Sequence, residues 1–195
     1  MKQIVSPALL PLMQSHIAKW GECRLCSLCD NRFRAVFFRG RIPCDVLFIG
    51  EAPGDSENMQ GVPFVELAPS GEILNRIIEA TGGNPTPPIL SLGEATPASY
   101  TWAMTNAVAC CSEGPPPEDS LLACSPRLLE LVKLASPKLI VAVGKQADHA
   151  VTKYGVNKQT KMTVIPHPSF MLRQEDLELE IRKAVLLILE ALSWI

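Results

Sequence analysis

The run Asp45-Val46-Leu47-Phe48-Ile49, followed at once by Gly50, decides the fold class of this chain. A compact apolar run ended by a glycine turn is typical of a buried parallel strand whose carboxyl end carries a functional loop. The same design recurs at residues 139–143 ahead of Gly144 and at residues 162–165 ahead of Pro166-His167. Residues 100–108 supply a fourth candidate. The sequence therefore predicts four strands, with distinctive residues just beyond their carboxyl ends.

Helical patterns lie before and between these strands. Apolar residues from Leu9 to Trp20 recur at helical spacing and end at Gly21. Because strand and helix then alternate, the fold class is α/β with a mainly parallel sheet. The proline- and glycine-rich residues 82–98 are expected to form a surface excursion, not a domain linker. The remaining predicted helices cover residues 70–80, 118–134, 145–154 and 174–192.

Length and composition predict one domain, residues 1–195. A chain of 195 residues with 47% hydrophobic content is long enough for one well-buried core. Its amino terminus lacks the charge-then-apolar design of a secretion signal, and the apolar run 184–189 is far below membrane-spanning length. The seven cysteines are too sparse for a disulfide scaffold. We therefore expect a cytoplasmic protein with reduced thiols and no membrane association.

The charge balance gives no overall attraction to nucleic acid. A net charge of −2 counts against a dedicated nucleic-acid-binding protein. A local basic face stays open, because four arginines gather within ten residues around three phenylalanines. The same group could equally be a solvated strand edge. These arginines are Arg32, Arg34, Arg39 and Arg41.

Two widely separated cysteine pairs, Cys23/Cys26 and Cys110/Cys124, suggest a metal centre. A Cys-x-x-Cys pair places two thiolates within reach of one centre, and the second pair can complete the ligation only if the fold brings both pairs together. The spacing leaves iron-sulfur and zinc open. Cys111 could replace Cys110, and Cys29 could be a third local ligand, although four ligands from the two pairs are the favoured set.

Three strand ends carry polar residues that could act together. Glu51 could orient a water molecule or stabilise a developing cation, or it could simply cap backbone amides. Asn106 offers the donor and acceptor needed to read the imide edge of a pyrimidine, although an asparagine in a turn is often structural. His167, held between two prolines, could donate to a carbonyl oxygen that gains negative charge. Phe64 either stacks on a base or belongs to the core.

Several motifs follow one another in order: Cys23-x-x-Cys26 with Arg32, Phe48-Ile49-Gly50-Glu51-Ala52-Pro53-Gly54, Gly61-Val62-Pro63-Phe64-Val65, Thr105-Asn106 leading to Cys110, then Cys124, and His167-Pro168-Ser169. In this order they resemble the uracil-DNA glycosylase superfamily, and most closely its iron-sulfur-containing family 4 of bacteria and archaea. The resemblance runs from about Cys23 to Phe170.

The resemblance implies a three-layer α/β/α fold with a central, mainly parallel four-stranded sheet. It implies a monofunctional uracil-DNA glycosylase that flips uracil from single- or double-stranded DNA and hydrolyses its N-glycosidic bond in base excision repair, acting as a monomer. Glu51 and His167 would be catalytic. Uracil would stack on Phe64 and be read by Asn106, and backbone amides around Ala52 and Gly54 would bind the departing base or a flanking phosphate. A structural [4Fe-4S] cluster would be held by Cys23, Cys26, Cys110 and Cys124.

Three stretches depart from the family pattern. Asp55-Ser56-Glu57-Asn58 lacks one acidic position, and Glu66-Leu67 places a bulky charged residue beside the expected base pocket. Residues 111–119 contain three acids and no base, which would repel DNA phosphate. Two alternatives therefore stay open: a glycosylase of the same fold that acts on a different or modified base, and a catalytically inactive, cluster-bearing binding protein.

Overall fold

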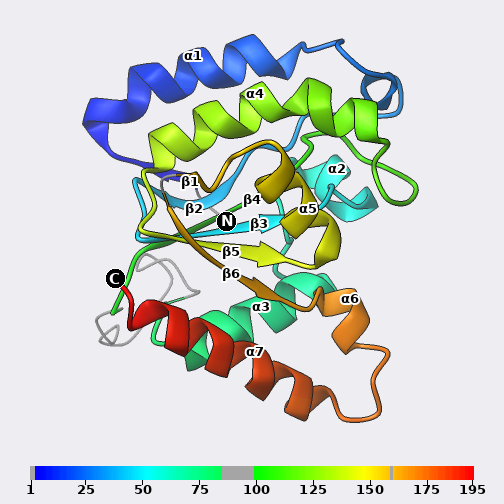
Figure 1. Ribbon diagram of the computed structural model, residues 1–195. Coiled ribbons are helices and arrows are strands. Elements are labelled where there is room, and N and C mark those ends of the chain that lie inside the picture. The colour runs from blue at the N-terminus through cyan, green and yellow to red at the C-terminus, as the bar shows by residue number, and fades with distance from the viewer. Residues whose placement is uncertain (1–2, 85–98, 159) are drawn as a thin grey trace.

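A mixed β-sheet forms the centre of the computed structural model, which describes residues 3–84, 99–158 and 160–195 (Figure 1). The described residues form six strands in the order β1-β2-β4-β3-β5-β6. Strand β2 runs antiparallel to β4, and the other neighbouring pairs are parallel. The bounds are β1 Gln3–Val5, β2 Arg39–Ile42, β3 Val46–Gly50, β4 Trp102–Asn106, β5 Leu139–Val143 and β6 Lys161–Ile165.

The four predicted strands are confirmed as β3 to β6, but the predicted count of four is wrong. Strands β1 and β2 extend the sheet beyond β4. Strand β1 has three residues, and β2 reads Arg39-Gly40-Arg41-Ile42, so neither contains the apolar run by which a buried strand is recognised. Their pairing depends on contacts with distant segments instead of on local pattern.

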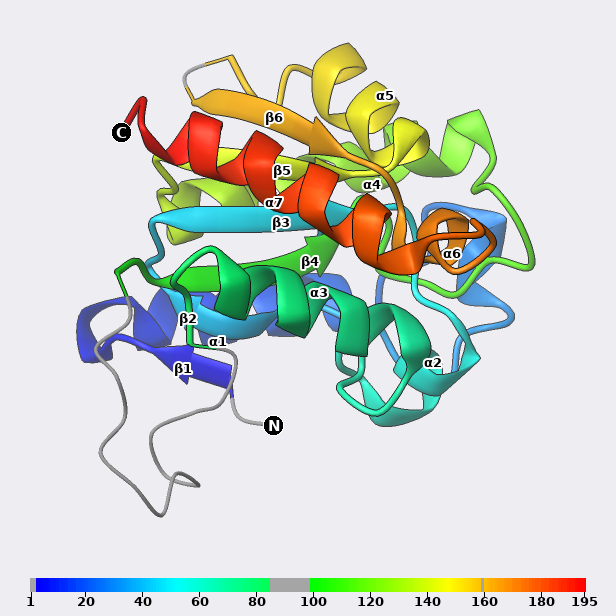
Figure 2. The ribbon, with the colours of Figure 1, turned by 90° about the horizontal axis from the view of Figure 1, so that it is seen from below.

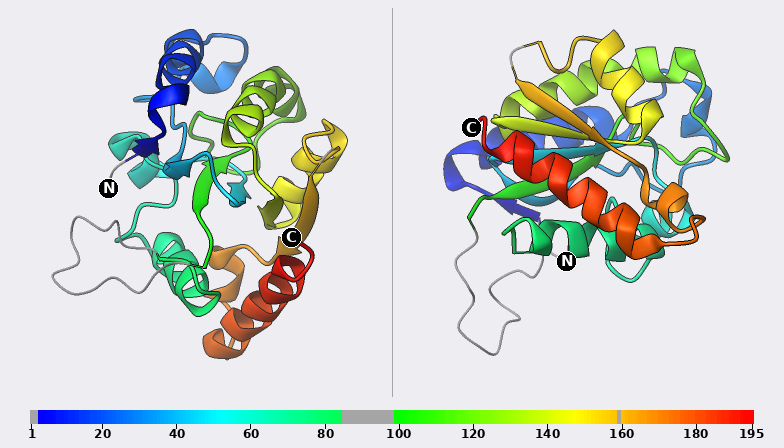
Figure 3. Two further views of the ribbon diagram at one scale, coloured as in Figure 1. Left: turned by 90° about the vertical axis from the view of Figure 1, so that its left-hand side faces the viewer. Right: turned by 60° about the horizontal axis from the view of Figure 1, so that its bottom comes forward.

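Helices cover both faces of the sheet, which confirms the α/β/α layering (Figures 2 and 3). Alternate residues of β3 enter two cores: Leu47 and Ile49 pack on one side of the sheet, and Val46 and Phe48 on the other. The first core is covered by α1 Leu10–Gly21, α4 Glu118–Ala135 and α5 Lys145–Lys153, and the second by α3 Pro69–Ala80, α6 Pro168–Met171 and α7 Leu177–Leu192. A short helix, α2 Asp55–Gln60, follows β3.

The five long helices begin and end within three residues of their predicted limits. Most of the predicted surface excursion at 82–98 lies outside the described residues. None of the helices in the described part of the chain is both long and apolar enough to cross a membrane.

The arginine cluster does not form one basic face. Arg39 is 1% exposed, whereas Arg41, two residues further along β2, is exposed. Exposed Arg34 lies over the ring of Phe33, with its guanidinium carbon 5.0 Å from the ring centroid. Arg32 donates to the sulfur of Cys110 at 3.5 Å. The four side chains therefore have separate surroundings, and a basic face made of all four is wrong.

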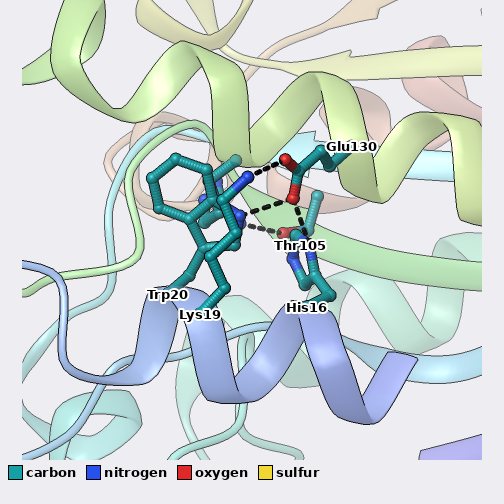
Figure 4. Close-up of polar contacts among 6 residues, drawn as sticks. His16, Lys19, Trp20, Thr105 and Glu130 are labelled. Atoms are coloured by element: carbon teal, nitrogen blue, oxygen red, sulfur yellow. Dashed lines mark hydrogen bonds and ion pairs between the residues drawn. The ribbon is translucent and has the colours of Figure 1, made fainter. Parts of the chain in front are cut away.

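One carboxylate fastens α1 to α4. Figure 4 shows His16, Lys19 and Trp20 of α1 pointing toward Glu130 of α4. Trp20 Nε1 donates to Glu130 Oε2 at 2.6 Å, His16 Nδ1 lies 3.2 Å from the same oxygen, and Lys19 pairs with Oε1. Burial works to raise the pKa of Glu130, but these three partners outweigh it and hold the pKa at about 2. The contacts fix the end of α1, just before Cys23, against the helix that carries Cys124.

Candidate active site

The carboxyl ends of β3 and β4 lie side by side. Gly50 pairs with Asn106 in the parallel register, and the Ala107 N–H donates to the Gly50 carbonyl at 2.8 Å. The Val108 N–H then donates to the Glu51 carbonyl at 3.2 Å. Partial burial of the Glu51 carboxyl raises its pKa. The sheet thus brings two of the predicted site residues, from loops 55 positions apart, to one edge.

Phe64 reaches the same edge from the loop after α2. Its ring and the Asn106 amide lie so close to Gly50 that a Cβ there would collide with both, so this position requires glycine. The Phe64 ring is 4% exposed, and its centroid lies 6.4 Å from that of the His167 ring at an interplanar angle of 41°. Phe64 therefore lies between the ends of β3 and β4 and the loop that carries His167.

Glu57 organises this region and was not singled out from the sequence. Its Oε1 accepts the Phe64 N–H at 2.6 Å and the Asn106 Nδ2 at 3.3 Å, while its Oε2 accepts the Gly54 N–H at 2.7 Å. Burial raises the pKa of Glu57, and the three hydrogen bonds act against that rise. The available sequence signal was half of a capping box: a glutamate stands three residues after the Gly54 N-cap, where its side chain can accept the N-cap N–H.

Glu57 occupies one predicted binding group and leaves another open. The Gly54 N–H, expected to bind base or phosphate, donates to Glu57 instead. The Asn106 Oδ1 is buried and has no hydrogen-bond partner among the described residues. Because buried acceptors are seldom left unpaired, this oxygen is a candidate for contact with a bound donor.

His167 is presented by the N-terminus of α6 as a neutral hydrogen-bond donor. Its Nδ1 accepts the Ser169 N–H at 3.2 Å and lies 2.8 Å from the Ser169 Oγ, whose hydroxyl can donate to it as well, and this pattern suits a neutral ring with its proton on Nε2. Burial and then the charge of Arg173 lower the pKa of His167. Gly144, at φ +92°, passes so close that a Cβ there would lie 2.9 Å from the His167 Cβ. The end of β5 thus leaves room for the imidazole.

The two cysteine pairs meet around one small cavity. Among the described residues, the wall of this space of about 20 Å³ includes Cys23, Cys26, Cys29, Cys110 and Cys124, together with Arg32 and Arg127. Cys111 instead has its sulfur 3.7 Å from Oδ1 of Asp55. None of the seven cysteines forms a disulfide, and the described part of the chain holds no set of three His, Cys, Asp or Glu side chains able to bind a metal ion as placed. The gathered donors are soft sulfur atoms, which suit an iron-sulfur group or zinc.

Comparison with known proteins assigns the family. The family model of the uracil DNA glycosylase superfamily matches residues 37–192. This match covers most of the chain, from just before β2 through α7. The chain belongs to this superfamily.

Curated relatives within the uracil DNA glycosylase superfamily include proteins named type-4 uracil-DNA glycosylase. The chain is 34% identical to that of Saccharolobus solfataricus over 128 residues, 65% of this chain and 52% of the relative. It is 29% identical to that of Sulfurisphaera tokodaii over 164 residues, 81% of this chain and 66% of the relative. A third, from Thermotoga maritima, is 29% identical over 174 residues, 81% of this chain and 82% of the relative. The chain thus spans about half to two thirds of the length of the first two.

The structure shows the surroundings of two stretches that were expected to depart from the family-4 pattern. Leu67 is 96% exposed, so its side chain lies in solvent. In the acidic stretch, Glu118 contacts Lys153 at 2.7 Å and His149 at 3.0 Å, and it accepts the Tyr154 hydroxyl. The bonds from Lys153, Tyr154 and His149 lower the pKa of Glu118 to about 2. The Lys153 ammonium therefore offsets one of the three acids that would otherwise repel phosphate.

Proposed function

We propose that this protein is a monofunctional uracil-DNA glycosylase, which flips uracil out of DNA and hydrolyses its N-glycosidic bond in base excision repair. The observation that carries the proposal is the buried, unpaired Oδ1 of Asn106 next to an Nδ2 held by Glu57. The imide edge of uracil offers a donor N3–H beside an acceptor O4, which matches an amide oxygen beside an amide N–H. Membership of the superfamily and the names of its type-4 relatives support the same function.

The chemistry needs stabilisation of two opposite charges. Breaking the bond between C1′ and N1 leaves an oxocarbenium-like sugar and a uracil anion. Neutral His167 donates its Nε2–H to uracil O2, where negative charge develops. Glu51 stabilises the cationic sugar and orients the water that adds to C1′, taking its proton as a general base. The proton then passes through solvent to the departing base, so the products are free uracil and an abasic sugar.

Binding precedes this step. The extrahelical base stacks on Phe64 and pairs with Asn106, and the Ala52 amide contacts the base or its phosphate. Because the Gly54 amide is already engaged by Glu57, this amide is left out of the proposed binding set. Uracil-containing DNA is the proposed partner, either single- or double-stranded, with the protein acting as a monomer.

The cysteine cavity is the proposed site of a [4Fe-4S] cluster, with Cys23, Cys26, Cys110 and Cys124 as ligands. The chemistry of the donor set supports this, because all five cysteines on the wall are soft sulfur donors. The lining favours Cys110 over Cys111, while Cys29 stays an alternative ligand. Such a group supplies a cross-link between the segment after α1 and the segments around α4. A reducing cytoplasm, where we place the protein, keeps these thiols available.

A base-release panel tests the function. Purified protein is incubated with oligonucleotides that carry a single uracil, thymine, hypoxanthine or xanthine, and the released base is measured by chromatography. We expect the protein to release uracil, and to release it faster than any of the other three bases. If the protein releases another base and leaves uracil in place, it is a glycosylase with a different substrate. If protein with its full iron content releases no base from any of the four substrates, it is a catalytically inactive binding protein.

A further inference from the structure

Phe64, the proposed stacking residue, has a strained backbone. Its φ of +48° lies in the left-handed region, which residues with a side chain seldom adopt. Such conformations persist only where the surroundings over-determine them, and they gather at functional sites. Since the backbone conformation of residue 64 sets the direction of its ring, whatever holds this backbone also orients the stacking surface.

Both polar groups of the Phe64 backbone are held. Its N–H donates to Glu57 Oε1 at 2.6 Å, and its carbonyl accepts from Nη1 of Arg39. The carbonyl sits in a tight space, because a Cβ on Gly71 would lie 2.6 Å from that oxygen. Glu57 of α2 thus holds the backbone N–H of Phe64, and Arg39 of β2 holds its carbonyl.

Arg39 is buried, which is unusual for an arginine. It is 1% exposed, and in residues 3–84, 99–158 and 160–195 it forms no salt bridge. Its Nη2 donates to Asn75 Oδ1 on α3, and its guanidinium carbon lies 5.3 Å from the centroid of the Trp102 ring. Burial lowers the pKa of Arg39 to about 10, against a smaller opposing effect of Glu66. Burying a cation without an ion pair is costly, so a residue that served packing alone would be better replaced by an apolar one.

We propose that Arg39 is a positioning residue for base recognition. Its planar fork bridges Asn75 and the Phe64 carbonyl, and thereby holds the Phe64 ring in the orientation in which a flipped base stacks. Lysine cannot replace it fully, because an ammonium on a flexible stem lacks the two fixed, parallel donors. This inference rests on the proposed function, since the stacking base belongs to that proposal.

A double-mutant cycle separates positioning from general stabilisation. The variants are Arg39→Met, Phe64→Ala and the two combined, and the measurement is kcat and KM for uracil release at a temperature where each is folded. We expect Arg39→Met to lower kcat/KM about tenfold, chiefly through KM, since stacking contributes to binding of the extrahelical base. In the Phe64→Ala background the same change should cost less than about threefold, because the ring that Arg39 orients is gone. Equal costs in both backgrounds, or an unchanged KM, would overturn the proposal.

One control and one fallback variant complete the design. Arg41→Met removes the same charge two residues away on β2, but from an exposed side chain, and is expected to leave kcat and KM unchanged. If Arg39→Met does not fold, Arg39→Lys takes its place in the cycle, with a smaller loss in the same direction and the same criterion of non-additivity.

An observation independent of catalysis keeps this inference distinguishable from the proposed function. The Phe64 ring lies close enough to His167 to shift its ring-proton resonances, so NMR reports the orientation of Phe64 directly. Arg39→Met should move the His167 resonances, and Arg41→Met should not. If wild-type protein releases no uracil, the proposed function fails, and the NMR result alone decides the positioning role: unmoved His167 resonances would refute it.

Discussion

The Asn106 side chain donates its Nδ2 to Oε1 of Glu57 over 3.3 Å, and this bond determines which part of the amide is left for a ligand. The same oxygen accepts the Phe64 N–H, so one carboxylate orients two of the proposed base-contacting residues. The Asn106 Oδ1 is then directed away from Glu57, and it has no partner among the described residues. The acceptor side of the amide is thus presented to a donor such as the N3–H of uracil.

Replacing Glu57 by glutamine is predicted to disturb this arrangement while keeping the side-chain volume. Glutamine has one oxygen where glutamate has two, so it cannot accept the N–H groups of Gly54 and Phe64 and the Asn106 amide together. We expect kcat/KM to fall about tenfold and the free energy of unfolding by about 1 kcal/mol, measured by uracil release and urea denaturation. Glu79→Gln, at an exposed position, is the control; an equal effect there would argue against the network.

His167→Ala is predicted to lower kcat about 100-fold or more, the size of effect seen when one donor to a developing anion is removed. Ser169→Ala should have a much smaller effect, because the Ser169 backbone N–H still donates to Nδ1 and only the hydroxyl, whose Oγ lies 2.8 Å from Nδ1, is lost. Single-turnover rates of the two variants provide the comparison. Comparable losses in both would show that the hydroxyl, and not the backbone, orients the ring.

The pH dependence of kcat/KM should have an acid limb that belongs to Glu51. Burial raises the pKa of this carboxyl above its ordinary 4.5, and activity needs the ionised form, so the rate falls as pH drops through the raised pKa. In Glu51→Gln this limb should disappear along with most of the activity. The lowered pKa of His167, below 6.5, keeps the imidazole neutral at pH 7. An acid limb that persists in residual Glu51→Gln activity would assign the titration elsewhere.

The same raised pKa predicts a stability effect of opposite sign. The folded protein binds the Glu51 proton more tightly than the unfolded chain, so this group contributes stability at low pH that is lost as pH rises through the folded pKa. At pH 7, Glu51→Gln should therefore be at least as stable as wild type in thermal denaturation. A variant that is both inactive and destabilised would point to a structural role.

Cys124→Ser is predicted to remove most of the bound iron, whereas Cys111→Ser should retain it. Cys124 lines the cavity shared by the cysteine pairs, but Cys111 lies beside Asp55. Iron and sulfide analysis of the two variants measures the difference, and loss of the cross-link should lower Tm by about 5 °C or more. If Cys111→Ser loses its iron and Cys124→Ser keeps it, the assignment of the ligands is reversed. If wild-type protein contains stoichiometric zinc, the site holds zinc and not an iron-sulfur cluster.

The elements that could be predicted are those whose signal is local. The apolar run before Gly50 identifies β3, and helical spacing identifies α3 and α7. Strand β2 was missed because Arg39 violates the usual rule that arginine is exposed, and its burial depends on partners from α3 and β4. No local pattern reveals these partners.

The same distinction separates the site residues. Glu51, Asn106 and His167 follow recognisable strands, so the position of the sheet edge predicts where they gather. Glu57 could not be assigned its role in the site: its bond with Gly54 is local, but Phe64 and Asn106 come from other segments, and Asn106 reaches it only in the folded chain. Cys110 and Cys111 are adjacent in sequence, and only their directions in space separate them.

Single-turnover release of uracil from one oligonucleotide, by wild-type protein and by Asn106→Ala, tests the central claim most directly. We predict that wild type releases uracil and that the variant, folded and with unchanged iron content, does so about 100-fold more slowly, because the amide that reads the imide edge is gone. A wild-type protein that leaves uracil in place, or a variant as fast as wild type, would contradict the account.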